Sequence, residues 1–204
     1  MTTVEVYFDP ACPWSWMTSR WVAEAAPCRD VAVRWRAFSL AIVENRAGDV
    51  PTPDHRVSLG ALRVVEAVWA DEGDEPIGRL YTEIGRRFHL EGDRSIAAVG
   101  AALEAAGLDP DTISAADDAR WDAEIEGSMA DAAAVVGDDV GVPVLVFHDG
   151  DEEHGISGPV MSPAPTGDDA LDLWDHVLAL SARRSFFELK RSRTAPPQFA
   201  PPPP

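Results

Sequence analysis

The chain has 204 residues and a formal net charge of −18, and 46% of its residues are hydrophobic. This length fits one large domain or a small domain with an insertion, and the apolar fraction is enough for a buried core. The negative charge argues against nucleic acid and anionic membranes as partners, because both would repel it. The sequence also lacks the basic start of a signal peptide and an apolar run long enough to span a membrane.

The first predicted strand, residues 3–8, leads directly into a cysteine that opens a helix. Polar and apolar residues alternate along this strand, and the segment from Pro13 to about Ala26 has helical spacing. Pro13 is well placed in a first helical turn, where amides lack partners. Free amides and the helix dipole favour a thiolate at Cys12, so we predict a nucleophile with a depressed pKa. The alternative is a buried packing residue.

Ser15 occupies the position where a dithiol motif, Cys-x-x-Cys, has its second cysteine. A serine can donate a hydrogen bond to a thiolate, but it cannot attack a mixed disulfide. Cys28 cannot replace it, because a helix between the two cysteines would separate them by roughly 24 Å and a disulfide tolerates about 7 Å. The sequence therefore predicts a one-thiol mechanism. It also predicts a structural Cys28 and a reducing, cytoplasmic location.

The rest of the chain alternates between strand and helix patterns. Residues 31–38 form a second predicted strand, parallel to the first, and residues 39–55 are predicted as a loop around Gly48, Pro51 and Pro53. Residues 57–136 have helical spacing throughout, far more than one crossover needs. We therefore expect a thioredoxin-like domain, residues 1–55 and 137–190, interrupted by a helical insert, residues 56–136.

The C-terminal part begins with Pro143, which opens a short β-branched run and is a candidate cis-proline. Two strands near residues 143–147 and 153–157 form a predicted hairpin. Thr166 is the predicted cap of a last helix, and residues 191–204, rich in proline, are expected to be extended or disordered.

Other cofactor classes lack support in the sequence. The five histidines show no i, i+4 pair, and there is no Cys-x-x-Cys, so no metal site is predicted. No Gly-x-Gly-x-x-Gly follows a strand, so no nucleotide cofactor is predicted.

Several blocks together resemble a known family. They are Phe8-Asp9-Pro10-x-Cys12-Pro13-Trp14, Thr18–Trp21, Ser39–Ile42, Glu44–Arg46, Tyr81–His89, Val140-Gly141-x-Pro143, Phe186–Arg191 and Pro196–Phe199. The order of elements is similar to that of the DsbA branch of the thioredoxin fold. The blocks resemble, more narrowly, its mycothiol-dependent nitroreductases, and they span nearly the full chain. Family members carry Cys-Pro-Trp-Cys, so Ser15 is a departure that puts the intramolecular dithiol step in doubt.

The resemblance implies an α/β fold and a reductase that uses mycothiol as its electron source. Small electrophiles, such as nitro compounds, or mixed disulfides would be the acceptors. An external low-molecular-weight thiol would then have to release any adduct from Cys12, since the chain has no resolving cysteine. The sequence leaves open whether the protein is a monomer or a homodimer.

The resemblance also assigns roles to individual residues. Pro143 would lie against Cys12 and present the backbone of Val142 to a substrate, although a strand-opening proline without such a role is the alternative. Trp14 would form an aromatic wall of the site, and the alternative is simple packing. Asn45 would line the pocket, and the alternative is a turn residue. His89 would contact substrate, and the alternative is a residue at a helix end without that role. The predicted catalytic residues are Cys12 and Ser15, and the predicted substrate-binding residues are Pro13, Trp14, Asn45, His89, Val142 and Pro143.

Two alternatives from other classes stay open. Kappa-class glutathione transferases and hydroxychromene-carboxylate isomerases share this fold and insert, but their motif begins with serine where this chain has Cys12. The second alternative is a binding protein that forms a mycothiol adduct on Cys12 without turnover.

Overall fold

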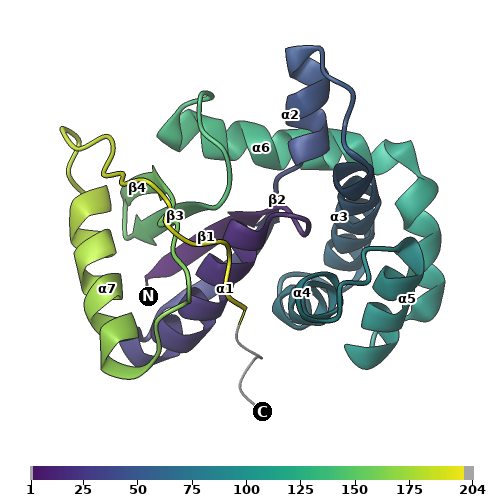
Figure 1. The fold of residues 1–204 in the computed structure, drawn as a ribbon, viewed down its shortest axis with the longest axis horizontal. Coiled ribbons are helices and arrows are strands. Elements are labelled where there is room, and N and C mark those ends of the chain that lie inside the picture. The colour runs from purple at the N-terminus through teal and green to yellow at the C-terminus, as the bar shows by residue number, and fades with distance from the viewer. Residues whose placement is uncertain (1, 200–204) are drawn as a thin grey trace.

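The computed structural model describes residues 2–199 and has a mixed four-stranded sheet at its centre (Figure 1). The strands are β1 (Thr3–Phe8), β2 (Ala32–Ala37), β3 (Val144–Asp149) and β4 (Glu152–Ser157), in the order β2-β1-β3-β4. β1 pairs with β2 in parallel and with β3 antiparallel, and β3 and β4 form a hairpin. The predicted βαβ start and hairpin are both confirmed, and β1 is a central strand.

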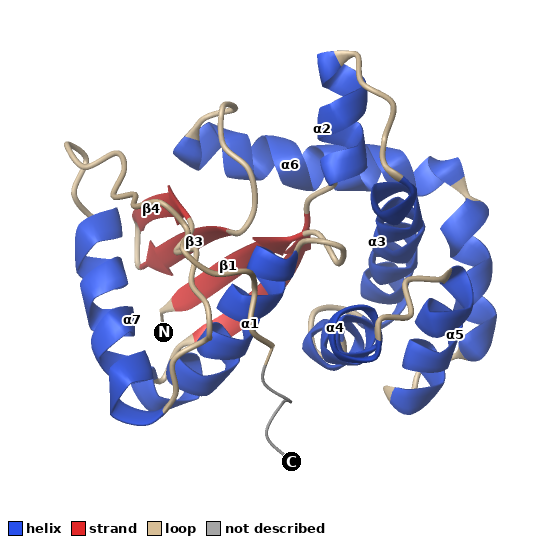
Figure 2. Cartoon of the chain, viewed as in Figure 1, coloured by secondary structure: helices blue, strands red, loops and turns tan. Residues whose placement is uncertain are grey.

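Helices surround this sheet (Figure 2). The first, α1 (Pro13–Ala25), packs against the last, α7 (Gly167–Ser181), mainly through Trp21 and Trp174. The centroids of these two buried rings are 5.5 Å apart, and the Trp21 Nε1–H donates to the carbonyl of Ala170 at 2.8 Å. The buried indole N–H of Trp21 is therefore satisfied where two distant parts of the chain meet. Elsewhere, α6 (Asp122–Val136) contacts β2, β3 and β4.

The helical insert begins earlier than predicted. Residues 39–55 are not a loop, because α2 spans Leu40–Ala47. The Ser39 side chain accepts from the amide of Ile42 at 3.3 Å and caps the helix, while Gly48 ends it with a φ of 84°. The remaining insert consists of α3 (Pro53–Glu72), α4 (Ile77–Gly85), a π-helical stretch (Arg86–Glu91), α5 (Ile96–Ala105), 3₁₀ segments (Pro110–Asp117 and Ala119–Trp121) and α6.

Two smaller expectations, a capping Thr166 and a buried Cys28, differ from the structure. Thr166 directly precedes α7, but its side chain makes no capping hydrogen bond. Cys28 is not a buried packing residue: it is exposed in a 3₁₀ turn, Ala26–Arg29, at the far end of α1 from Cys12. Residues 182–199 contain no helix or strand, and residues 200–204 lie outside the described residues. No helix in residues 2–199 is both long and apolar enough to cross a membrane.

Gly85, at the end of α4, allows the insert to pack closely against α1. A Cβ atom at this position would lie 2.2 Å from ring atoms of the fully buried Trp16. We expect Gly85→Ala to lower the free energy of unfolding by about 1–3 kcal/mol, because neither the helix nor the indole can move away cheaply. Chemical denaturation monitored by circular dichroism measures this change.

Gly127→Ala in α6 is the matched control. A Cβ atom there meets nothing within 4 Å, so the substitution should be neutral or slightly stabilising, as alanine in a helix is favoured over glycine. Equal loss of stability in both variants would contradict the close approach of α4 to Trp16.

Candidate active site

Cys12 lies at the N-cap of α1, directly after the turn that leaves β1. Its backbone N–H donates to the carbonyl of Asp9 at 2.9 Å, which closes the turn. Its sulfur accepts from the backbone N–H of Ser15 at 3.5 Å, and Pro13 is the first helical residue. The sequence-predicted junction is therefore present, with the sulfur at the positive end of a thirteen-residue helix.

The loop before β3 covers the sulfur from the other side. The Val142–Pro143 peptide bond is cis, and the Cys12 Sγ–H donates to the carbonyl of Val142 at 3.8 Å. Pro143 is held in turn, because its carbonyl accepts from the amide of Gly158 at 2.7 Å. Val142 and Pro143 thus lie beside Cys12, although Val142 is 130 residues away along the chain.

Ser15 is fully buried on the first turn of α1. Its hydroxyl lies near the Cys12 sulfur and has no other hydrogen-bond partner among the described residues. This free hydroxyl can donate to a thiolate when one forms. The second thiol of the chain, Cys28, lies beyond the opposite end of α1, so the two thiols are not brought together.

Burial decides the protonation state of Cys12, contrary to the sequence prediction. The residue is only 6% exposed, and this desolvation raises the pKa of the thiol above its ordinary value. The hydroxyl and amide of Ser15 lower the pKa by stabilising the thiolate, and the nearby carboxyl of Asp9 raises it. The expected depressed pKa is therefore wrong, because the helix start is covered by protein and not open to water.

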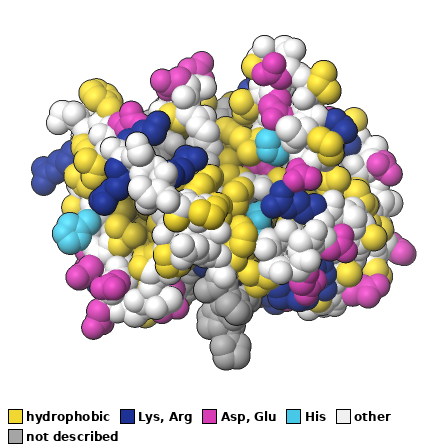
Figure 3. Space-filling model, viewed as in Figure 1, with side chains coloured by type: hydrophobic (Ala, Val, Ile, Leu, Met, Phe, Trp, Pro, Cys, Tyr) yellow, Lys and Arg dark blue, Asp and Glu magenta, His cyan; other side chains and the backbone are white. Residues whose placement is uncertain are grey.

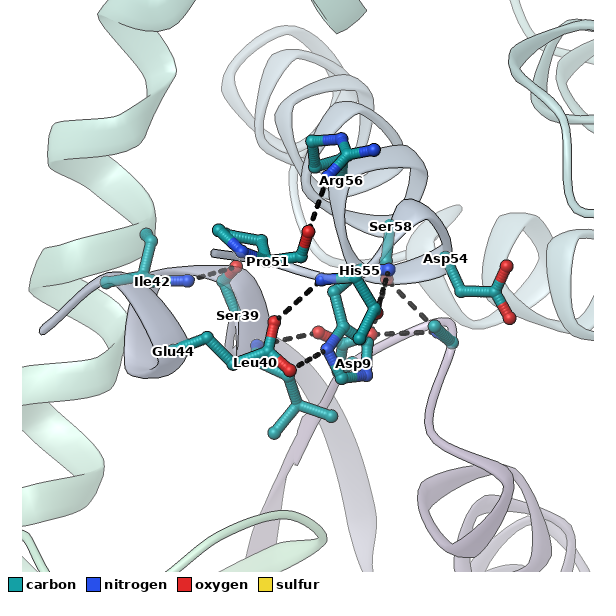
Figure 4. A network of polar contacts seen from close by, with 12 residues as sticks. Asp9, Ser39, Leu40, Ile42, Glu44, Pro51, Asp54, His55, Arg56 and Ser58 are labelled. Atoms are coloured by element: carbon teal, nitrogen blue, oxygen red, sulfur yellow. Dashed lines mark hydrogen bonds and ion pairs between the residues drawn. The ribbon is translucent and has the colours of Figure 1, made fainter. Parts of the chain in front are cut away.

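A buried carboxyl group, Asp9, organises the turn before Cys12 (Figure 4). Its Oδ1 accepts from the amide of Ala11 at 2.8 Å and from the hydroxyl of Ser58, and its Oδ2 accepts from the amide of Leu40 at 2.8 Å. Burial raises the pKa of Asp9, while these hydrogen bonds lower it. The carboxyl group therefore joins the end of β1 to the start of α2 and to α3.

A second contact keeps α2 and α3 together beside this group. The Glu44 carboxylate lies 2.7 Å from Nδ1 of His55 and also accepts from the amide of Thr52 at 3.1 Å. The hydrogen bond with His55 lowers the pKa of Glu44. Figure 4 shows Glu44 and His55 beside Asp9 in this network of polar contacts.

His89 does not end a solvated helix; it is buried between two aromatic rings. Its ring lies 5.8 Å from that of Trp16 and 5.2 Å from that of Phe199. Because a carbonyl oxygen can only accept, the 2.9 Å contact between Nε2 and the carbonyl of Pro10 places the proton on Nε2. Its Nδ1 is buried without a partner among the described residues. His89 therefore supports the turn two residues before Cys12.

The other predicted binding residues differ in their surroundings. Pro13 and Trp14 are half-buried on the first turn of α1, next to Cys12. Asn45 is not in a loop but on α2, where it is exposed in a surface hollow with Leu59 and Asp122 among its neighbours. None of the residues that line this hollow belongs to the Cys12 turn.

Several residues of the site were not singled out from the sequence. Asp9 could have been found, since a charged residue directly after a buried strand needs partners. Ser58 interrupts the apolar face of α3, which is a weaker signal. Phe199 and Arg193 lie in the C-terminal segment, where the guanidinium of Arg193 is 4.5 Å from the centroid of the Trp14 ring. No sequence pattern places an extended proline-rich segment at this site.

The sheet order, the thiol at the start of α1 and the cis-proline against it define a thioredoxin-fold protein of the DsbA kind. The likeness to solved structures agrees with this class of fold. A sequence model for the Rv2466c-like family, described as mycothiol-dependent nitroreductase Rv2466c, matches residues 11–191. The chain belongs to this family, and it is a thiol-dependent oxidoreductase.

The individual proteins that this chain resembles are between 12% and 31% identical to it. The chain is 31% identical to the uncharacterized protein Rv2286c of Mycobacterium tuberculosis, over 95% of this chain and 84% of that protein. Among solved structures, the cytosolic disulfide reductase DsbM of Pseudomonas aeruginosa has a TM-score of 0.61 at 16% identity, covering 87% of this chain and 99% of DsbM. The DsbA of Chlamydia trachomatis has a TM-score of 0.53 at 12% identity, with 89% of each chain covered. These structural matches establish the fold.

The raised pKa of Cys12 predicts how its alkylation depends on pH. In a Cys28→Ser background, which removes the exposed thiol, the rate with iodoacetamide should have its inflection above about pH 8.5, the ordinary value for cysteine. Ser15→Ala should move the inflection further up, because the thiolate loses a hydrogen bond. An inflection below 8.5 in the parent would show that burial does not control this thiol.

The buried His89 predicts a loss of stability in acid. Burial lowers its pKa from 6.5 to about 4, so the unfolded chain binds a proton at higher pH than the folded protein does. The stability that requires a neutral ring is complete above about pH 6.5 and is lost as the pH falls towards 4, by about 3 kcal/mol.

A variant without an ionisable group at this position, His89→Phe, isolates this contribution. The difference in unfolding free energy between the parent and His89→Phe should shift by that amount between pH 7 and pH 4, as measured by urea denaturation. A difference that does not vary with pH would mean that His89 titrates normally.

Proposed function

We propose that the protein reduces small disulfides or other electrophiles with Cys12 as its single nucleophile and mycothiol as its reductant. The observation that carries this proposal is the pairing of Cys12 with a fully buried serine, Ser15, where a dithiol enzyme has its second thiol. Membership of a family described as mycothiol-dependent supports the choice of thiol. The covered sulfur next to Val142 and Pro143 supports a role in exchange with substrates that dock against this loop.

The exchange needs two steps. First, the Cys12 sulfur attacks one sulfur of a disulfide acceptor; a bond forms to that sulfur, the acceptor's S–S bond breaks, and the proton of Cys12 leaves with the departing thiol. Second, an external thiolate attacks the acceptor-derived sulfur of the mixed disulfide and displaces Cys12, which takes a proton again. Ser15 donates a hydrogen bond to the Cys12 thiolate in both steps.

The buried state of Cys12 fits this cycle. A thiol with a raised pKa is protonated at neutral pH and reacts slowly with untargeted electrophiles, because the thiolate is the nucleophile. It is also the poorer leaving group, so the adduct persists until a thiol enters the site. We infer that substrates and thiol must bind next to Val142 to react, in a reducing compartment such as the cytoplasm.

Asn45, His89 and Trp14 have different places in this proposal. Trp14 is half-exposed beside Cys12 and is suited to contact a bound molecule. His89 acts through the carbonyl of Pro10 and the ring of Trp16, so it positions the turn. Asn45 would reach a substrate only if that substrate extended to α2.

The two alternative functions, a different enzyme and a binding protein, differ in the ligands and turnover that they require. An isomerase or glutathione transferase of the kappa type would act with glutathione on a chromene-type substrate. A binding protein would take up mycothiol on Cys12 and keep it. Steady-state reduction of a disulfide by mycothiol and its recycling system, with activity lost in Cys12→Ser and kept in Cys28→Ser, would exclude both rivals.

Ser15→Cys should change the way in which an adduct leaves Cys12. In the parent, release of a labelled thiol from Cys12 should be proportional to the concentration of added thiol, because only an external thiolate can attack. A cysteine at position 15, one helical turn from Cys12, should expel the label in an internal step whose rate does not depend on added thiol.

Intact-mass measurement over time at several thiol concentrations distinguishes these outcomes. Ser15→Ala is the matched control, since it removes the hydroxyl without adding a thiol, and its release should stay thiol-dependent. Constant release from the parent without added thiol would contradict the one-thiol mechanism and would implicate Cys28.

A further inference from the structure

The C-terminal segment returns to the active site after α7. We call residues 183–199 the C-terminal strap; it crosses in front of α1 in Figure 1, where it is yellow. Near its end, the amide of Gln198 donates to the hydroxyl of Ser162 at 2.8 Å, and this hydroxyl donates to the carbonyl of Pro196 at 3.3 Å. Phe199 then packs on His89. The end of the strap is thus held by Ser162 and by His89.

The strap is basic, although the protein is strongly acidic. Residues 183–193 carry four arginines, one lysine and one glutamate, a net charge of +4, so the remaining chain carries −22. All five basic side chains belong to exposed residues, and none forms an ion pair with a carboxylate of the described residues 2–199. Dark blue side chains gather on the corresponding part of the surface in Figure 3. A local positive field therefore lies beside the site.

Arg193 brings part of this charge to the first turn of α1. The guanidinium carbon of Arg193, Cζ, lies over the ring of Trp14, two residues from Cys12, at 4.5 Å from the ring centroid. This cation–π contact holds the side chain against Trp14. The guanidinium of Arg193 makes no hydrogen bond or ion pair within the described residues 2–199, so its N–H donors stay available to an anion.

We propose that Arg193 determines specificity by selecting acceptors that carry a carboxylate or a similar anionic group near the reacting sulfur. The proposal rests on the reductase function proposed above and names the class of acceptor. A planar guanidinium binds a carboxylate with two parallel N–H···O bonds, which holds the acceptor next to Trp14 while Cys12 attacks. The chemical steps are unchanged, since Arg193 transfers no proton and forms no covalent bond.

Two chromogenic disulfides that differ in charge test this selection. In a Cys28→Ser background, 5,5′-dithiobis(2-nitrobenzoate), which carries carboxylates, is compared with the neutral 2,2′-dithiobis(5-nitropyridine), and the released thiolate gives the second-order rate constant with Cys12. Arg193→Gln should slow the anionic reagent about tenfold, the loss of one charge-assisted pair, and change the neutral reagent less than twofold. The parent's preference for the anionic reagent over the neutral one should weaken at high salt, because salt screens the charge of Arg193.

Arg191→Gln is the matched control, because it removes the same charge from the same exposed segment without a contact to Trp14. It should change either rate less than threefold. Equal slowing of both reagents by Arg193→Gln would show that Arg193 only supports the site, and no slowing of either would show that it has no role; both outcomes overturn the proposal. Failure of the parent's Cys12 to react with the neutral disulfide would instead overturn the proposed function.

Discussion

The hydrogen bonds of the buried Asp9 carboxyl group are the constraint on which the active site depends. A carboxyl group without exposure to water is costly unless its oxygens have partners. Here the partners come from three places: the amide of Ala11 in the Cys12 turn, the amide of Leu40 at the start of α2, and the hydroxyl of Ser58 in α3. The same group therefore sets the path of the chain into Cys12 and the position of the helical insert relative to the sheet.

This arrangement explains how the protein combines a covered thiol with chemistry at that thiol. Asp9 supports the turn before Cys12, His89 supports it through the carbonyl of Pro10, and the carbonyl of Val142 accepts from the Cys12 thiol. The contacts of Asp9 and His89 fix backbone of the turn, whereas the contact of Val142 is to the sulfur itself. The hydroxyl and amide of Ser15, together with the amide of Trp14, can stabilise a negative charge on the sulfur. Reactivity is thus confined to molecules that fit beside this turn.

Much of the fold could be predicted from the sequence, because its signals are local. The alternation of Val4, Val6 and Phe8 marks β1, Asp149-Gly150 marks the hairpin, and helical spacing marks the insert. α2 was missed because prolines and Gly48 dominate its surroundings, while the capping role of Ser39 depends on one side-chain rotamer.

The site was less predictable, since its properties depend on burial by distant segments. The position of Cys12 at a helix start is a local property, and the sequence indicates it. The raised pKa of this thiol is not a local property, because it follows from its burial by Val142 and the insert. The exposure of Cys28 and the burial of His89 are likewise set by packing partners far away in the chain.

The place of β1 in the sheet has a consequence for biosynthesis. β1 is a central strand, but its antiparallel partner β3 follows the entire helical insert. Because a chain emerges from the ribosome N-terminus first, Cys12 is made before the groups that shield it, Val142 and the strap. During this interval Cys12 is open to solvent and to oxidants. The nascent protein therefore passes through a stage in which its thiol is less protected than at any later time.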